Sequence, residues 1–139
     1  MTTLGIIEQH ISALQKNLKI LKRLQKYSQK EIEGNDIVKG AVERYLYLLV
    51  QDGINLSEAT IAFRNFRRPD TYAEAFRILQ EEKLISPALS EKMVQVAKFR
   101  NVIAHDYKKI DYKIIYDVLQ DGLKDIEQFI GEIKKALKL

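Results

Sequence analysis

The feature of this sequence that most constrains its fold is the spacing of apolar residues near both ends. Near the N-terminus they recur at steps of three and four residues: Leu4, Ile7, Ile11, Leu14, Leu18 and Leu21. A second set near the C-terminus does the same: Tyr112, Tyr116, Leu119, Leu123, Ile126, Ile130, Ile133 and Leu137. Because an α-helix turns once every ~3.6 residues, each set forms one apolar stripe. The stripes predict a first helix over about 4–31 and a last helix capped by Asp111.

Two helix-start signals lie between these stripes. Thr71 and Glu74 have the spacing of a capping box, which predicts a short helix over about 72–83. Ser86 stands before a proline, and a capping hydroxyl followed by proline at the first helical position is typical of a helix N-terminus. We therefore expect another helix over 87–104.

A long, mostly apolar segment over about 36–65 predicts a central, buried helix, although Gly40 and Gly53 each weaken it by about 1 kcal/mol relative to alanine. No useful length of the chain alternates with the period of two that a half-buried strand needs. We therefore predict an all-α fold, an antiparallel up-and-down bundle of four to five helices. Nothing resembles a linker or a repeat, so residues 1–139 are expected to form a single domain.

Composition narrows the possible functions. The chain has no cysteine, which excludes disulfides and thiolate metal sites. Its longest apolar run, Tyr45 to Val50, is far shorter than the roughly 20 residues that span a bilayer, so we expect a soluble cytoplasmic protein that does not enter a membrane. The net charge of +4 permits binding to a polyanion such as RNA without requiring it.

The candidate chemistry lies in RNVIAHDY, residues 100–107, at the junction of the last two predicted helices. If the helix ends near His105, extended backbone beyond it brings His105 and Tyr107 to one side. An arginine, a histidine and the amide of Asn101 suit RNA cleavage by the 2′-hydroxyl without a metal, because that reaction needs proton transfer and positive charge against the phosphorane. Arg100 can hold two phosphate oxygens, and His105 can move protons near neutral pH.

One histidine does not easily act as both base and acid. A two-fold homodimer that places two copies of the motif in one cleft provides both groups, because such an interface repeats every residue. The apolar stripes that could form this interface could equally form the core of a monomer. The sequence leaves these two uses of the same residues open.

Structural roles compete with each catalytic one. Arg100 could simply pair with Asp106 or Glu91, His105 could cap a helix end, and Tyr107 could pack over the junction. His10 reads as an ordinary helix-surface residue. The two histidines lack metal-ligand spacing, so no metal site is expected, and glycine-rich phosphate loops and serine-hydrolase elbows are absent.

A second candidate RNA contact is the basic cluster of Arg64, Arg67 and Arg68, which is interleaved with Phe63 and Phe66. Arginines bind phosphate and aromatic rings stack on bases, so this composition suits single-stranded RNA. The alternative, which we favour, is a solvated loop whose two rings face the core.

Arg100, Asn101, His105 and Tyr107 form the motif RNxxxHxY, preceded by VERYL at 42–46 and RPDTYAEAFRILQ and followed by IDYKIIYDVL. From Val42 onward the chain resembles the HepT-like proteins of the HEPN superfamily. That resemblance implies a helical bundle that dimerises and acts as a metal-independent endoribonuclease toxin, without a cofactor. It further implies that Arg100 and His105 are the catalytic pair, contributed by both subunits, with Asn101 or Asp106 in support.

The resemblance also implies a partner. HepT-like toxins are typically silenced by a small nucleotidyltransferase antitoxin of the MNT type, which in some systems adds AMP to the tyrosine that matches Tyr107. A bulky, charged nucleotide there would block RNA from the cleft. The chain departs from many relatives in INLSEATI, where Asn55 stands in place of an aspartate and no histidine follows.

The leading hypothesis is therefore an endoribonuclease toxin. The alternative is a non-catalytic nucleotide- or RNA-binding subunit of a two-component nucleotidyltransferase, with Arg100 as a phosphate clamp. A third possibility is a purely structural helical partner protein. Growth arrest that depends on His105 would separate the first hypothesis from the other two.

Overall fold

The computed structural model describes residues 3–105 and 111–139 and, of residue 105, the backbone only. Its elements in chain order are α1 (Thr3–Leu24), α2 (Gln29–Glu33), α3 (Asp36–Phe63), α4 (Tyr72–Glu81), α5 (Pro87–His105), α6 (Tyr112–Asp117), the π-helical turn η2 (Val118–Gly122) and α7 (Leu123–Leu137). Every element in this described part is helical, so the predicted all-α class is confirmed.

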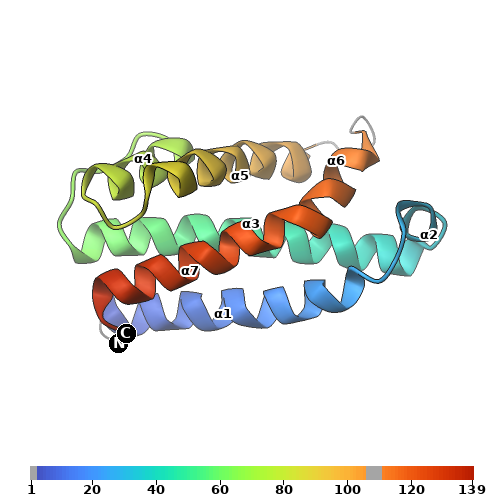
Figure 1. Cartoon of the computed structure of the whole chain (residues 1–139), viewed down its shortest axis with the longest axis horizontal. Helices are drawn as coiled ribbons and strands as arrows, with labels where there is room; N and C mark the ends of the chain where they lie inside the picture. Colours follow the sequence, from blue (N-terminus) through green and yellow to red (C-terminus); the bar gives the residue numbers. More distant parts are fainter. Residues whose placement is uncertain (1–2, 106–110) are drawn as a thin grey trace.

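The helices form an elongated bundle with α3 at its centre (Figure 1). On one side α3 packs against α1, and on the other it packs against α4 and α5. α7 crosses the front of the bundle and contacts α1 and α5 (Figure 1). Both ends of the chain lie at the same end of the bundle (Figure 1). The prediction of an antiparallel bundle is thus confirmed, with α3 as the central helix expected from its apolar sequence.

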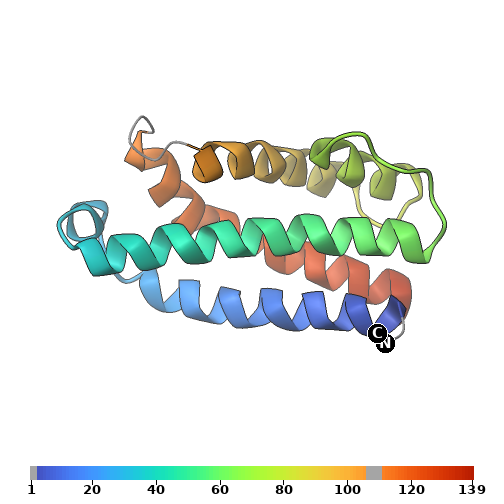
Figure 2. The same ribbon diagram turned by 180° about the vertical axis from the view of Figure 1, so that it is seen from behind.

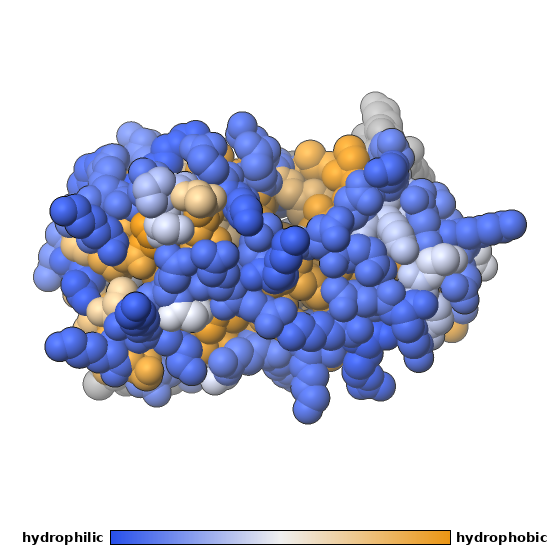
Figure 3. All heavy atoms as spheres, in the orientation of Figure 1, coloured by the Kyte–Doolittle hydropathy of each residue, from blue (hydrophilic) through white to orange (hydrophobic). Residues whose placement is uncertain are grey.

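Apolar side chains from all the long helices meet in one core. Ile7, Leu14 and Leu21 of α1 are fully buried, as the stripe of the first helix predicts. Phe76 of α4 and Phe129 of α7 meet edge to face, with ring centroids 5.5 Å apart, a geometry that aromatic pairs favour. Hydrophilic residues cover most of the surface in this view, and apolar surface shows in patches (Figure 3). None of the described helices is both long and apolar enough to cross a bilayer.

The predicted first helix was too long. α1 ends at Leu24, and the short α2 begins after Ser28. Ser28 Oγ accepts a hydrogen bond from the Glu31 backbone amide at 3.1 Å, and Glu31 Oε1 accepts one from the Ser28 amide at 3.0 Å. This reciprocal capping box starts a new helix inside the range that we assigned to the first one. The spacing of Ser28 and Glu31 was the signal in the sequence.

The other start signals are confirmed. Thr71 Oγ1 accepts from the Glu74 amide at 3.0 Å, Ser86 Oγ accepts from an amide of the first turn of α5 at 3.2 Å, and Asp111 Oδ1 accepts from the Lys113 amide at 3.0 Å. The box at Thr71 is only half formed, because the Glu74 carboxylate accepts from the Asp70 amide instead. These caps fix where α4, α5 and α6 begin.

The last predicted helix is interrupted. A π-helical turn, η2, separates α6 from α7, and Leu119 within it remains fully buried. Figure 1 shows the bend in this region, which directs α6 towards the end of the bundle where α5 ends. The extra residue in a π-helical turn shifts the register of the helix, so both α6 and α7 keep an apolar face on the core.

The helix interior of α3 offers a test of the fold. Gly40 is exposed, and a Cβ added there meets nothing within 4 Å. Glycine in a helix interior costs about 1 kcal/mol relative to alanine, so Gly40→Ala is expected to raise the free energy of unfolding by about 0.5–1 kcal/mol. Urea unfolding followed by circular dichroism measures it. Gly122→Ala is the control. Its added Cβ would meet Val118 Cγ1 at 3.2 Å, so its free energy of unfolding should rise less. A loss of stability in Gly40→Ala would contradict the open surface.

Candidate functional site

Arg100 is the central residue of the candidate site, and α3 holds it in place. Its Nε donates a hydrogen bond to Gln51 Oε1 at 3.1 Å. Gln51 Nε2 in turn donates to Asn55 Oδ1 at 2.9 Å. Gln51 and Asn55 lie four residues apart and therefore share one face of α3. A chain of two hydrogen bonds thus fixes the guanidinium of a half-buried arginine against the central helix.

The rest of the guanidinium contacts neutral groups. Arg100 Nη1 donates to Asn101 Oδ1 at 3.3 Å. Its guanidinium carbon lies 5.3 Å from the centre of the Tyr72 ring and 6.0 Å from that of Tyr47, within the range of cation–π attraction. Arg44 lies 5.9 Å from the same Tyr47 ring, so two cations gather about it. Arg100 and Asn101 are predicted site residues, whereas Tyr47, Tyr72 and Arg44 are not.

No carboxylate of the described residues forms an ion pair with Arg100. Glu91, one of the two acidic partners considered from the sequence, does not pair with it, and the other, Asp106, lies outside the described residues. Within this part of the chain, Arg100 is oriented without being neutralised. A fixed and unpaired guanidinium is the kind of group that binds a phosphate with both of its terminal nitrogens.

The remaining motif residues are only partly described. α5 is described as far as His105 and places Asn101 on an exposed surface in its last described turns, so where the helix ends stays a prediction. The imidazole of His105 lies outside the described part, and so do Asp106 and Tyr107. The predicted convergence of His105 and Tyr107 therefore stays a prediction.

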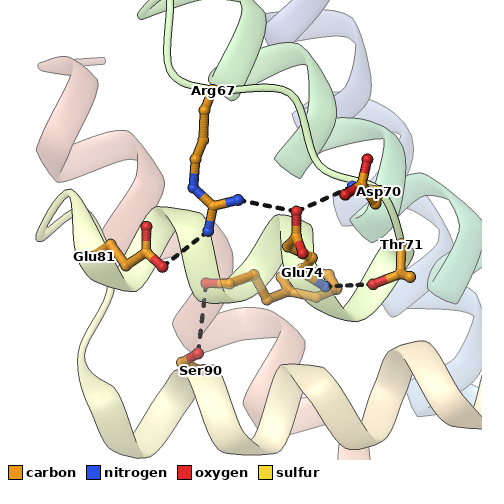
Figure 4. Close-up of polar contacts among 7 residues, drawn as sticks. Arg67, Asp70, Thr71, Glu74, Glu81 and Ser90 are labelled. Atoms are coloured by element: carbon orange, nitrogen blue, oxygen red, sulfur yellow. Dashed lines mark hydrogen bonds and ion pairs between the residues drawn. The ribbon is translucent and has the colours of Figure 1, made fainter.

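The basic cluster proposed as an RNA contact is largely engaged in structural contacts. Arg64 Nη2 donates to the Ala136 carbonyl at 2.9 Å, near the end of α7. Arg67 forms ion pairs with Glu74 at 3.0 Å and Glu81 at 2.9 Å (Figure 4). The hydrogen bond with Glu81 raises the pKa of the Arg67 guanidinium. Arg68 is exposed and has no hydrogen bond or ion pair with the described residues. An RNA contact by this cluster stays a prediction, with Arg68 as its available member.

A groove of about 450 Å³ opens beside the site. Asn101 and Tyr72, both of which contact Arg100, form part of its wall. These two residues therefore connect the groove with the guanidinium. Within the described residues, no group of three or more histidine, aspartate or glutamate side chains is placed to hold a metal ion.

The residues that sequence reasoning missed had a detectable signal. Tyr47, Gln51 and Asn55 recur every four residues in a helix that is otherwise mostly apolar. Such a stripe indicates a half-buried face of α3 at the margin of the core. The stripe alone did not reveal that α5 would bring Arg100 to it.

Comparisons with known proteins agree with this fold and show the family. A sequence profile of the family described as ribonuclease HepT-like matches residues 7–133. The mRNA nuclease HepT of Shewanella oneidensis is 35% identical over 66 residues, which span 48% of this chain and 50% of that protein. The tRNA nuclease HepT of Aphanizomenon flos-aquae is 22% identical over 132 residues, 95% of this chain and 90% of that protein.

The fold also matches a solved structure. The tri-AMPylated HEPN toxin of Shewanella oneidensis, in complex with an MNT antitoxin, superposes with a TM-score of 0.85 at 23% identity. The match covers 97% of this chain and 99% of that one. At this level of identity the likeness shows that the two chains share a fold.

The hydrogen bond between Gln51 and Arg100 can be tested by a double-mutant cycle. We expect Gln51→Ala and Arg100→Ala to couple by about 1 kcal/mol in the free energy of unfolding, because each removes the partner of the other. Urea unfolding of both single variants and the double variant gives the coupling. The control pair is Gln51→Ala with Arg68→Ala, which should be additive. Additivity of the first pair as well would show that the contact does not hold Arg100.

Proposed function

Because the chain belongs to the ribonuclease HepT-like family, we propose that it is a metal-independent endoribonuclease toxin of a HEPN–MNT toxin–antitoxin pair, acting on RNA in the cytoplasm. The observation that carries this proposal is the state of Arg100. Its guanidinium is fixed by Gln51 and Asn101 and is not neutralised by a carboxylate of the described residues. A phosphate of RNA is the natural ligand for such a group.

The proposed reaction is attack of a ribose 2′-hydroxyl on the adjacent phosphorus. His105 takes the proton of that hydroxyl, the new P–O2′ bond forms, and the P–O5′ bond breaks. The products are a 2′,3′-cyclic phosphate and a 5′-hydroxyl, whose oxygen receives a proton from a general acid. Arg100 stabilises the negative charge on the phosphorane, and the Asn101 amide donates a hydrogen bond to it. All three residues lie on the last turns of α5 or at its end.

The general acid requires a second imidazole, so the proposal includes a homodimer with two-fold symmetry. Exposed apolar side chains near the motif support it. Val102 follows Asn101 directly and is 41% exposed, and Ile114 of α6 is 48% exposed. Figure 3 shows an apolar patch where the end of α5 meets α6. An interface that buries this surface would bring together the two copies of the motif.

The proposed partner is an MNT-type nucleotidyltransferase. The Shewanella oneidensis HEPN toxin that shares this fold is tri-AMPylated and is bound to an MNT antitoxin. We propose that Tyr107, two residues after His105, accepts AMP in the same way. Several added nucleotides would place bulk and negative charge next to Arg100, where the RNA phosphate would otherwise bind.

Cleavage is expected to depend on His105. Loss of general acid–base catalysis reduces a rate by about 10² to 10⁴-fold, so His105→Ala should be nearly inactive while its circular dichroism spectrum is unchanged. The assay is cleavage of fluorescent single-stranded RNA in the presence of a chelator. His10→Ala is the matched control and should cleave normally. Equal cleavage by His105→Ala and wild type would refute the catalytic assignment, and RNA binding without any cleavage by wild type would favour the non-catalytic alternative.

Silencing is expected to depend on Tyr107. Wild-type protein incubated with an MNT-type nucleotidyltransferase and ATP should gain the mass of one or more AMP groups and lose its ribonuclease activity. Tyr107→Phe should keep its original mass, because phenylalanine has no oxygen nucleophile, and it should stay active. Intact mass spectrometry measures both, with Tyr27→Phe as the control that still gains AMP. AMP addition to Tyr107→Phe at another residue would contradict the proposal.

A further inference from the structure

The groove beside Asn101 has a chemistry that differs from that of the phosphate site. It lies between the loop that precedes α4, the first turn of α4, α5 and the C-terminal part of α3. Its volume of about 450 Å³ is within the range that small-molecule pockets occupy. A nucleotide whose phosphate contacts Arg100 would have its base within reach of this groove, because Asn101 and Tyr72 belong to both.

One wall of the groove is aromatic. Tyr72 is 36% exposed, and the guanidinium of Arg100 lies 5.3 Å from the centre of its ring. Stacking of a base on an aromatic side chain contributes favourably and tolerates any base, because every base has a π-face. Tyr72 therefore provides affinity for a base without selecting among the four.

Charged groups on the wall of the groove distinguish one base from another. The exposed side chains of Glu58, Asp70 and Lys98 line the groove, and none of the three has a hydrogen bond or ion pair with another side chain of the described residues. Two carboxylates and one ammonium give this wall a net charge of −1. It would repel a phosphate, which therefore stays at Arg100. An ionised carboxylate accepts hydrogen bonds only, so it favours a base edge that offers N–H donors.

The loop that carries Asp70 is held firmly. Glu74 bridges the Arg67 guanidinium and the Asp70 backbone amide, at 3.0 and 3.1 Å, while Thr71 caps α4 (Figure 4). The ion pair of Arg67 with Glu81 ties the same loop to the far end of α4. Arg67 thus supports the loop that lines the groove, through Glu74, without lining the groove itself. A preformed wall loses little entropy when a ligand binds.

We propose that this groove is the nucleobase subsite of the proposed ribonuclease and that it selects guanine next to the scissile phosphate. Guanine presents two adjacent donors, N1–H and the N2 amino group, which match the two oxygens of one carboxylate. Uracil presents a single N–H between two carbonyl oxygens, which a carboxylate repels. The inference rests on the proposed function for the role of the bound base, but binding itself does not require that cleavage occur.

The experiment therefore measures binding, in full-length His105→Ala protein that leaves RNA intact. Isothermal titration compares GMP with UMP, and short single-stranded RNAs that carry one guanosine or only uridines extend the comparison to the polymer. GMP is expected to bind about tenfold more tightly than UMP, the discrimination of one good bidentate contact. The same preference is expected in RNA. Equal affinity for the two mononucleotides would overturn the proposal.

Variants in the wall locate the preference. In the double variant Glu58→Gln and Asp70→Asn, the ratio of the GMP and UMP affinities should fall to about one, whereas Glu91→Gln, an exposed glutamate elsewhere on α5, should keep it. Tyr72→Ala should weaken both nucleotides equally, and Tyr72→Phe should restore them because it keeps the ring. A guanine preference that survives the double variant would overturn the assignment. If the binding tests succeed but the wild-type protein has no nuclease activity, the base subsite is supported and the proposed reaction is refuted.

Discussion

The hydrogen bond from Arg100 Nε to Gln51 Oε1 is the contact on which the site depends. It joins the end of α5 to the middle of α3, the two helices that the rest of the bundle holds in register. It also fixes which way the two terminal nitrogens of the guanidinium point. Asn101 and Tyr72 both contact the fixed guanidinium, and both line the groove.

The bundle makes this contact possible by giving α3 two kinds of face. Its apolar residues, among them Leu46, Leu49 and Ile54, are buried in the core. Its polar stripe of Tyr47, Gln51 and Asn55 faces α5 at the margin of that core. Figure 2 shows α3 running almost the full length of the molecule, so one rigid element supports both the packing and the site. Side chains on a packed helix lose less freedom when they bind than those on a loop.

Much of the fold could be predicted because helix periodicity and capping are local. The caps at Thr71, Ser86 and Asp111 stand where their spacing placed them. The apolar stripe ends at Leu21 and does not show where its helix stops, so the break before Ser28 was visible only in the spacing of Ser28 and Glu31. Local sequence also identified Arg100 and Asn101.

The partners of these residues could not be predicted, because they come from distant parts of the chain. Gln51 lies 49 residues from Arg100, and the carbonyl that Arg64 contacts lies 72 residues away. Composition cannot show that Arg64 is occupied by such a contact.

The groups that hold Arg100 have a consequence for its behaviour in solution. Gln51, Asn55 and Asn101 are amides, which neither gain nor lose a proton near neutral pH. The hydrogen bonds that orient the guanidinium therefore do not change across the range in which an imidazole titrates, about pH 5 to 8. For the proposed reaction, a change in rate over that range is therefore not expected to come from the groups that orient Arg100.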